Sequence, residues 1–323
     1  MSCVQAVNAA LREEMERDSS VIHMGIDVAR AGGVFGSSRG LLDAFGPARV
    51  RDTPISEAAM VSLAVGASLV GVRPVVHLMF ADFLTRAWDE IVNQAAKIRY
   101  MFGGVSVPLT IMASTGGGLS AAAQHSQSVE SLCVNIPGLK VVCPSTPADC
   151  KGLLKSAIRD NNPVIFLDSK ALLNSRGEVP DGDYLVPIGK AAVVRQGSDV
   201  TIVALSRMVP VSNAAAEKLA AEGISAEVID LRSVYPMDTE TIAASVKKTG
   251  RLITVHEAPV FAGIGAEIVA SMVAHNYADL RAAPMRLGAP HTPTPFARGL
   301  EARHFPSEEG IIAAARRQMS KAV

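Results

Sequence analysis

The first residue with catalytic potential in this chain is a carboxylate at the start of an apolar helix. The string Asp52-Thr-Pro-Ile-Ser-Glu57 precedes an almost wholly apolar run, Ala58–Val70. Pro54 disfavours helix just before it and Ser56 is a favoured N-cap type, so Glu57 is expected in a first helical turn. The carboxylate there is either a structural group favoured by the helix dipole or a poorly solvated acid–base group.

Two further clusters follow apolar runs of strand length. Phe80-Ala-Asp-Phe83 places aromatic rings at a strand end, where they serve either core packing or a flat ligand. Gly116-Gly-Gly118 permits close approach of backbone or ligand, and Gln124-His-Ser-Gln127 follows it, where we expect a helix to start. His125 in this polar setting is a candidate acid–base group.

A third cluster ends a predicted helix. The segment Ala157-Ile-Arg-Asp-Asn-Asn162 leads into a strand, so its last carbonyl groups lack helical partners. With Asp160 among them, they form either a plain C-cap or a site for a monovalent cation.

Generic motifs and bulk properties exclude several function classes. There is no P-loop, no HExxH and no CxxC, and Gly263-Ile-Gly265 lacks the third glycine of a dinucleotide fingerprint. The 31 Lys and Arg residues balance 31 Asp and Glu residues, so no nucleic acid or anionic membrane is expected as a partner. No signal peptide or spanning segment is recognisable, and a cytoplasmic location is expected.

The expected fold class is α/β, with two open parallel-sheet domains in tandem. Apolar runs of strand length alternate with helical patterns, and the composition is 49% hydrophobic but 4% aromatic, which suits aliphatic parallel sheets covered by helices. A Gly-, Pro- and Asp-rich segment separates two such series. The predicted domains are 1–175 and 190–323, joined by a linker at 176–189. The first series has strands at 21–27, 73–80, 109–114, 139–145 and 163–168 and helices at 3–17, 57–71, 82–100 and 147–160.

The strings quoted above, taken in order, resemble the β subunit of thiamine-diphosphate-dependent 2-oxoacid dehydrogenases, a family that includes pyruvate, branched-chain 2-oxoacid and acetoin dehydrogenases. The likeness extends over nearly the whole chain. Further strings that carry it are Gly71-Val-Arg-Pro74, Ala95-Ala-Lys-Ile-Arg-Tyr100, Pro137-Gly-Leu-Lys-Val-Val142, Pro144-Ser-Thr-Pro147, Asp230-Leu-Arg232, Pro236-Met-Asp238, Val255-His-Glu257, Gly265-Ala-Glu-Ile268 and Ala289-Pro-His-Thr-Pro293.

The resemblance implies a transketolase-like architecture, with a pyrimidine-binding domain and a transketolase C-terminal domain. It also implies an α2β2 heterotetramer with a β–β contact and a lipoyl-bearing acyltransferase as a further partner. Thiamine diphosphate would be shared between subunits, with its diphosphate and Mg²⁺ on the α subunit and its aminopyrimidine on this chain. The chain has no Gly-Asp-Gly followed by an Asn pair at metal-binding spacing, in agreement with that division.

By the same resemblance, Glu57 is the catalytic carboxylate that hydrogen-bonds a pyrimidine ring nitrogen. Phe83 is the aromatic residue stacked on the pyrimidine, and His125 is an active-site histidine that handles protons or the incoming lipoyl group. A potassium site bound mostly through carbonyls is implied at Leu109, Ala157, Ile158, Asp160 and Asn162.

Three positions depart from the family pattern. Ile26 and His77 stand where carboxylates are common, and Met112 stands where an arginine is common. They affect the expected substrate and the coupling between active sites, while Glu57 is retained. The alternatives are therefore a divergent carboligase, a split transketolase-like subunit acting on sugars, and a scaffold subunit without catalysis.

Overall fold

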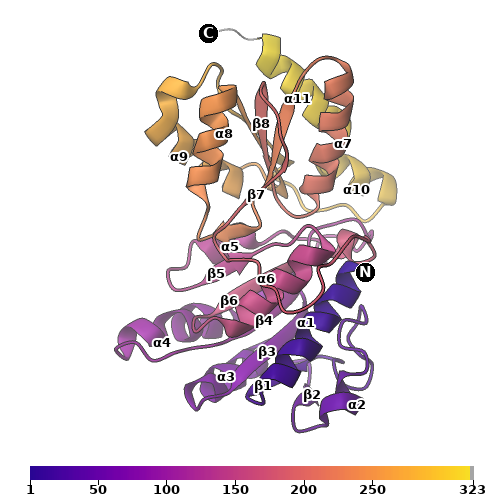
Figure 1. Cartoon of the computed structure of the whole chain (residues 1–323). Coiled ribbons are helices and arrows are strands. Elements are labelled where there is room, and N and C mark those ends of the chain that lie inside the picture. Colours follow the sequence, from indigo (N-terminus) through magenta and orange to yellow (C-terminus); the bar gives the residue numbers. More distant parts are fainter. Residues whose placement is uncertain (321–323) are drawn as a thin grey trace. The chain divides into compact units, whose positions relative to one another are not determined.

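Strands and helices alternate along both halves of the chain, in agreement with the predicted α/β class. The computed structural model describes residues 1–320 of the 323. The chain forms two units (Figure 1). The first contains Met1–Thr115 and Leu132–Ile188, and the second contains Gly116–Ser131 and the chain from Gly189 onward.

The sheet of the first unit has the strand order β5-β6-β4-β3-β1-β2, with parallel pairing throughout. Its strands are β1 (Val21–Gly25), β2 (Val50–Asp52), β3 (Arg73–Phe80), β4 (Thr110–Thr115), β5 (Lys140–Val142) and β6 (Val164–Ser169). Its helical segments are α1 (Cys3–Arg17), α2 (Leu41–Phe45), α3 (Glu57–Leu69), η1 (Ala81–Ala87), η2 (Glu90–Ala95), α4 (Ala96–Met101), α6 (Pro147–Arg159) and η3 (Lys170–Leu172). Helix α5 (Glu130–Val134) begins in the segment assigned to the second unit.

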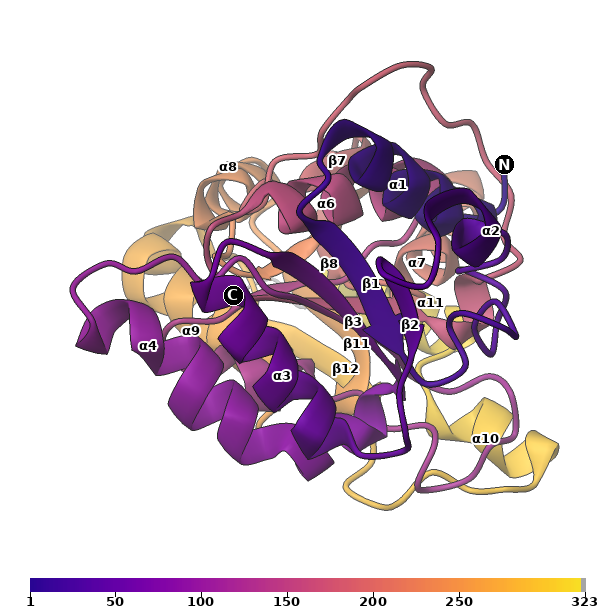
Figure 2. The same ribbon diagram turned by 90° about the horizontal axis from the view of Figure 1, so that it is seen from below.

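Helices cover both faces of this sheet. Figure 2 shows α1 and α6 on one face and α3 and α4 on the other. The core under α1 and α6 is mainly aliphatic and includes Leu11, Leu154 and Phe166. Local signals fix where these helices begin. Ser2 forms a capping box with Gln5 at α1, and Thr146 caps α6, whose first residue is a proline.

The second unit repeats the pattern with one antiparallel edge. Its sheet has the order β12-β11-β8-β9-β7, and only the β7–β9 pair among the described strands of this sheet is antiparallel. The strands are β7 (Ala192–Arg195), β8 (Val200–Ala204), β9 (Ala226–Asp230), β11 (Leu252–Pro259) and β12 (Met285–Ala289), with a short β10 (Ser233–Tyr235) between β9 and α8 in the chain. The helices are α7 (Met208–Ala221), α8 (Thr239–Thr249), α9 (Ile264–Asn276), η4 (Tyr277–Asp279), α10 (Arg298–His304) and α11 (Glu308–Ser320).

Two sequence-based expectations for local structure were wrong. The segment 82–100 is not one α-helix but the 3₁₀ helix η1, the π-helical η2 and the short α4. Helical periodicity does not distinguish the hydrogen-bond spacings of these forms. Residues 124–127 are irregular, and the next helix begins at Glu130. The chain there has positive φ at Ser120 and Ala122, which is incompatible with a continuous helix.

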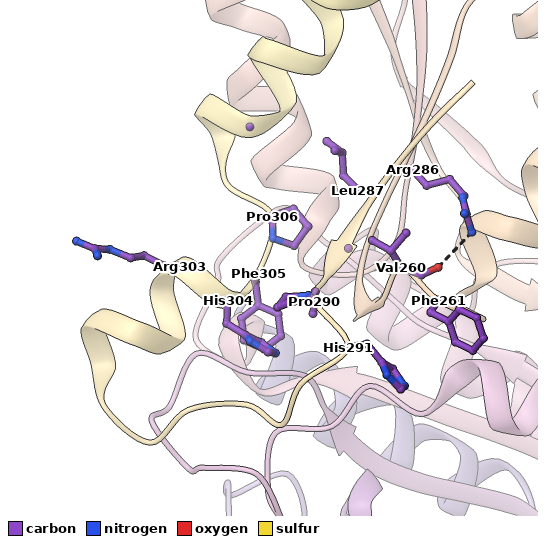
Figure 3. A pocket seen from close by; sticks show the side chains of 13 residues that line it. Val260, Phe261, Arg286, Leu287, Pro290, His291, Arg303, His304, Phe305 and Pro306 are labelled. Carbon is purple, nitrogen blue, oxygen red and sulfur yellow. Dashed lines mark hydrogen bonds between the residues drawn. The ribbon is translucent and has the colours of Figure 1, made fainter. Parts of the chain in front are cut away.

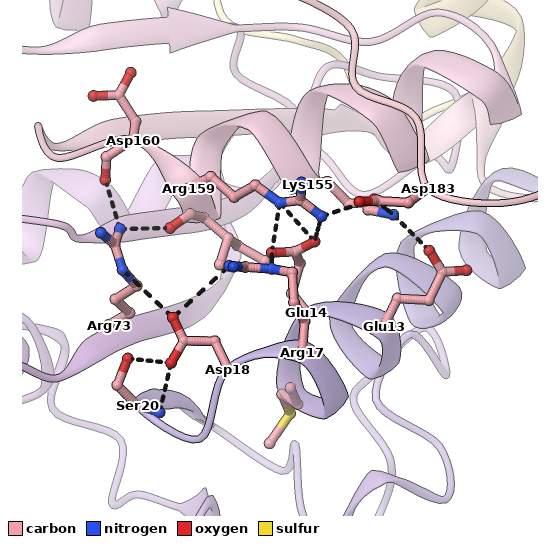
Figure 4. Close-up of polar contacts among 12 residues, drawn as sticks. Glu13, Glu14, Arg17, Asp18, Ser20, Arg73, Lys155, Arg159, Asp160 and Asp183 are labelled. Atoms are coloured by element: carbon pink, nitrogen blue, oxygen red, sulfur yellow. Dashed lines mark hydrogen bonds and ion pairs between the residues drawn. The ribbon is translucent and has the colours of Figure 1, made fainter.

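Buried charges join α1 to α6 in the first unit (Figure 4). Glu14, which is fully buried, accepts a bidentate pair of hydrogen bonds from Arg159 at 2.6 and 3.0 Å, and a further one from Arg17. Lys155, also buried, contacts Glu13 at 2.7 Å and Asp183. Because Asp183 lies in the predicted linker, this network fixes the linker to α6.

Removing the Glu14 carboxylate should strongly destabilise the first unit. Glu14→Ala removes the fully buried acceptor shared by Arg159 and Arg17 and leaves Arg159 paired only with the exposed Asp183. Breaking a buried pair in this way typically costs about 3 kcal/mol of unfolding free energy. The matched control is Glu222→Ala, which removes an exposed ion pair with Arg316 and should change stability little. Urea denaturation of both variants measures the difference, and equal midpoints would contradict the role given to Glu14.

Candidate active site

The loops after β1 and β2 are joined at the carboxyl end of the first sheet, where ligands of open parallel sheets bind. Asp52 ends β2 and accepts hydrogen bonds from the N–H groups of Ala29 and Arg30 at 2.7 and 3.3 Å. The N–H of Thr53 donates to the carbonyl of Gly25 at 2.9 Å. This arrangement fixes the path of the chain into α3.

Glu57 is the first residue of α3 and is only 6% exposed. Ser56 occupies the N-cap position as predicted, but its side chain makes no capping hydrogen bond. Among residues 1–320, no hydrogen bond or ion pair to the Glu57 carboxylate is present. The site therefore holds a poorly solvated carboxylate that is free to bind a group from outside the chain.

Phe83 lies on a segment that packs directly against α3. A register shift between β3 and β4 lies between His77 and Phe80, and Met79 has φ of +60° within it. Such bulges redirect side chains at the ends of strands. Phe80 and Phe83 meet edge to face at 6.0 Å, and η1, which carries Phe83, packs on α3. The structure thus places Glu57 and a half-buried aromatic ring on neighbouring elements of one unit.

His125 lies in the segment 116–131, which belongs to the second unit. Two carboxylates of that unit hold this segment. Glu301 accepts hydrogen bonds from the N–H groups of Gly118 and Ser120, both at 2.9 Å, and Glu257 accepts a longer one from Gly117. A Cβ atom at Gly117 would lie 2.2 Å from the Phe305 ring, so glycine is required for this approach. His125 itself is half-buried.

A buried carboxyl group, that of Glu130, lies within this segment. Burial raises the pKa of Glu130 to about 7, and the neighbouring charge of Glu257 acts in the same direction. Glu257 in turn forms a 3.0 Å ion pair with Arg207. Glu130 therefore titrates close to neutral pH while Glu257 keeps a cationic partner.

Two adjoining pockets open beside this segment in the second unit. The larger, of about 630 Å³, is lined by basic and aromatic side chains that include Arg286, His291, Arg303 and Phe305 (Figure 3). The smaller, of about 480 Å³, shares His291 and Phe305 with it. Ser126 and Gln127, which follow His125, line the smaller pocket.

The residues of the implied potassium site gather around the turn from α6 into β6. The carbonyl oxygens of Ile158 and Asp160 both accept hydrogen bonds from Arg73, at 3.0 and 3.1 Å (Figure 4). The Asp160 carboxylate accepts from the Asn162 N–H, and Leu109 accepts from Val164. The Asp160 carboxylate also forms an ion pair with Lys140 at 2.5 Å, so Arg73 and Lys140 already supply positive charge to the acceptors at this turn.

Gly263 and Gly265, which resemble part of a dinucleotide fingerprint, have a packing role here. A Cβ atom at either position, or at Gly288, would lie within 3.0 Å of the His256 ring. His256 is buried, its Nδ1 lies 3.0 Å from the Ala258 carbonyl, and burial lowers its pKa to about 4. The glycines make room for a neutral imidazole.

The three departures from the family pattern are all buried and uncharged. Ile26 and Met112 are core residues at 5% and 1% exposure. His77 is 2% exposed, and burial lowers its pKa, so it is neutral at physiological pH. Its ring centroid lies 6.3 Å from that of His23.

Within the part of the chain that the structure describes, no helix has the length and apolar character of a membrane span.

The comparisons with known proteins agree with this geometry. Residues 1–176 match the model of the transketolase pyrimidine-binding domain, and residues 189–311 match the transketolase C-terminal domain. A split-gene transketolase, described as an inactive β4 tetramer, has the same fold with a TM-score of 0.83. It is 25% identical and covers 100% of this chain and 99% of its own. The chain therefore has the two-domain, transketolase-type architecture of thiamine-diphosphate enzymes.

Sequence relatives identify the family of this chain within the transketolase-type architecture. The chain is 47% identical to acetoin:2,6-dichlorophenolindophenol oxidoreductase subunit beta of Cupriavidus necator, which covers 99% of this chain and 97% of the relative. It is 44% identical to 2-oxoisovalerate dehydrogenase subunit beta of Bacillus subtilis, with 99% of both covered. It is 45% identical to pyruvate dehydrogenase E1 component subunit beta-2 of Oryza sativa, with 100% and 87% covered. The chain belongs to the family of β subunits of thiamine-diphosphate-dependent 2-oxoacid and acetoin dehydrogenases, which are oxidoreductases.

Sequence reasoning missed the two carboxylates that hold the His125 segment. Glu301 contacts residues more than 180 positions away, and no local pattern distinguishes it from an ordinary helical glutamate. Glu257 was noted only as part of a family string. The glycine triplet at 116–118 was the one available signal, because it indicates close approach without naming the group that approaches.

Ionisation of Glu130 should lower stability as pH rises. Its pKa in the folded chain, about 7, lies above the ordinary value of 4.5. The folded state therefore binds the proton more tightly, and stability falls as pH rises from about 4.5 through 7. Glu130→Gln cannot ionise, so its unfolding free energy relative to the parent chain should be higher at pH 8 than at pH 5, by roughly 2 kcal/mol. Denaturant titrations at both pH values test this, and a pH-independent difference would rule it out.

Proposed function

We propose that this chain supplies the pyrimidine half of a thiamine-diphosphate site shared with an α subunit. The assembled enzyme performs oxidative decarboxylation of a 2-oxoacid, or cleavage of acetoin, and transfers the acyl group to lipoamide. The partners are an α subunit in an α2β2 heterotetramer with a β–β contact, and a lipoyl-bearing acyltransferase. The diphosphate and Mg²⁺ belong to the α subunit.

The observation that carries this proposal is the environment of Glu57. A carboxylate with 6% exposure and no partner among the described residues is costly to desolvate unless it meets a compensating group. A ring nitrogen of the aminopyrimidine is such a group, and a shared proton would relieve the cost. Phe83, on the adjoining η1, offers a ring face for the flat heterocycle.

Each residue then has a role of its own. Glu57 holds a proton against the ring nitrogen, and its low solvation keeps water from competing for that proton. Phe83 orients the ring. When bound, thiamine diphosphate supplies an electron sink for breaking the bond next to the substrate carbonyl. His125 exchanges protons with the substrate or the lipoyl group, and its segment is kept in position by Glu257 and Glu301.

Exposed apolar side chains support association with an α subunit. Helix α3 carries Leu63 at 59% exposure, and Ile55 and Val70 at its two ends are 79% and 80% exposed. Gly66 lies on this helix with no atom near its Cβ position, so another helix can approach closely. An apolar, partly small-residue helix face of this kind is typical of a subunit interface rather than of a solvated surface.

The proposal also includes a potassium site, the domain boundaries and the location of the protein. We propose a potassium ion bound by Leu109, Ala157, Ile158, Asp160 and Asn162, functional domains at 1–175 and 190–323 with a linker at 176–189, and a cytoplasmic location. The carbonyls of Ile158 and Asp160 already bind the Arg73 guanidinium, which supports an affinity of this turn for positive charge. A split transketolase activity has weaker support, because that relative is 25% identical while the dehydrogenase β subunits are 44–47% identical. Retention of Glu57, Phe83 and His125 argues against a scaffold role.

The test of function is co-purification with the α subunit followed by a substrate panel. The panel contains pyruvate, branched-chain 2-oxoacids, acetoin and ketose phosphates, with an artificial electron acceptor in place of lipoamide.

Glu57→Gln in the assembled complex should lower kcat at least tenfold, within the roughly 10²–10⁴-fold range typical of acid–base groups. Glu240→Gln, at a side chain that is 88% exposed, is the control. Unchanged turnover in Glu57→Gln would favour the scaffold role.

A charge on α3 should prevent assembly without unfolding the chain. Leu63→Asp places a carboxylate in the proposed interface, at a side chain that is exposed in the isolated chain. We expect Leu63→Asp to reduce the yield of α2β2 complex at least tenfold, because an unpaired buried charge costs several kcal/mol. Leu185→Asp, at a residue 44% exposed on the linker, should assemble normally. Size-exclusion chromatography with light scattering reports both, and equal assembly would contradict the proposed face.

A further inference from the structure

Two cysteines meet where α1 and α6 begin. Cys3 is the first residue of α1, and Cys150 lies in the first turns of α6. A side-chain hydrogen bond joins their sulfur atoms, and both belong to the buried cluster under these helices, with exposures of 2% and 3%. Both are free thiols. Neither residue has a role in the function proposed above.

The two thiols differ in their readiness to lose a proton. The hydrogen bond from Cys150 lowers the pKa of Cys3, although burial and the charges of Asp168 and Asp149 oppose this. The same hydrogen bond, together with burial, raises the pKa of Cys150 well above its ordinary value. Cys3 is also at a helix N-terminus, which favours a thiolate. The pair therefore consists of an attacking sulfur and a protonated partner that stabilises it.

A cavity opens at the start of α1, beside the residues that flank Cys3 in the chain. Ser2 and Val4 line this cavity of about 540 Å³, while Cys3 itself is 2% exposed and belongs to the core cluster. Arg39 and Arg176 line the same cavity and contribute positive charge. A peroxide is small enough to enter such a space, whereas a protein thiol or glutathione disulfide is bulkier.

We propose that Cys3 and Cys150 form a reversible disulfide in the folded chain when it meets a peroxide. The Cys3 thiolate attacks one oxygen of hydrogen peroxide, the O–O bond breaks, and a sulfenic acid and water result after uptake of one proton. The Cys150 sulfur then attacks the Cys3 sulfur, and the displaced hydroxide takes the Cys150 proton to leave as water. Two thiols lose two electrons in total, and one peroxide is reduced to two waters.

The disulfide ties together the two helices that cover one face of the first sheet. The first turn of α1 already holds the segment that follows β6, since the N–H groups of Cys3 and Val4 donate to the carbonyls of Ser175 and Leu173 at 3.1 and 3.0 Å. Oxidation would fix this junction covalently. Reduction by a dithiol reverses it.

Peptide mapping of the whole folded chain tests the proposal. The chain is treated with hydrogen peroxide in native buffer, free thiols are alkylated, and tryptic peptides are analysed by tandem mass spectrometry. The expected product joins peptide 1–12 to peptide 141–151 and disappears after dithiothreitol. Because peptide 141–151 also contains Cys143, fragmentation and the Cys143→Ala variant must place the link on Cys150.

Two further samples make the result decisive. In Cys150→Ser, which keeps a hydrogen-bond donor but has no resolving thiol, Cys3 should stop at the sulfenic acid, which dimedone traps. Cys133→Ala, at a buried cysteine outside the pair, should retain the Cys3–Cys150 link. Separate alkylated Cys3 and Cys150 peptides from the peroxide-treated folded chain would overturn the proposal. A link that forms only in denaturant would overturn it as well.

Discussion

The structure of the first unit depends on one constraint: a carboxylate must be kept poorly solvated at the mouth of an apolar helix. Glu57 meets this condition because Asp52 and Thr53 fix the entry into α3 and because the helix below it offers no polar partner. A group in that position is destabilising in isolation. In the function that we propose, a cofactor ring compensates it, so the local fold and the proposed chemistry depend on the same residue.

In the second unit, the main constraint is that an irregular segment must be held in a fixed position. The stretch 116–131 contains residues with positive φ and cannot form a regular helix, so its N–H groups need other acceptors. Glu301 and Glu257 provide them, and glycine at 116–118 allows the close approach. His125 thus depends on carboxylates far away in the sequence, which makes its position a property of the whole unit.

Much of the fold follows from local sequence signals. Strand β3 was predicted with its observed bounds, and α1 begins at its capping box, because periodicity and caps act over a few residues. The burial of Glu57 could also be anticipated from the apolar run behind it. The contacts of Glu301 could not, since they join residues far apart in sequence. The 3₁₀ and π turns at 81–95 were also hidden, because side-chain spacing hardly differs among helix types.

The most direct measurement is a structure of the chain assembled with its α subunit and thiamine diphosphate. The account predicts a Glu57 carboxylate oxygen within hydrogen-bond distance, about 2.6–3.0 Å, of a pyrimidine ring nitrogen, with the Phe83 ring against the heterocycle. A pyrimidine bound elsewhere, or a Glu57 side chain turned to bulk water in the loaded complex, would contradict it.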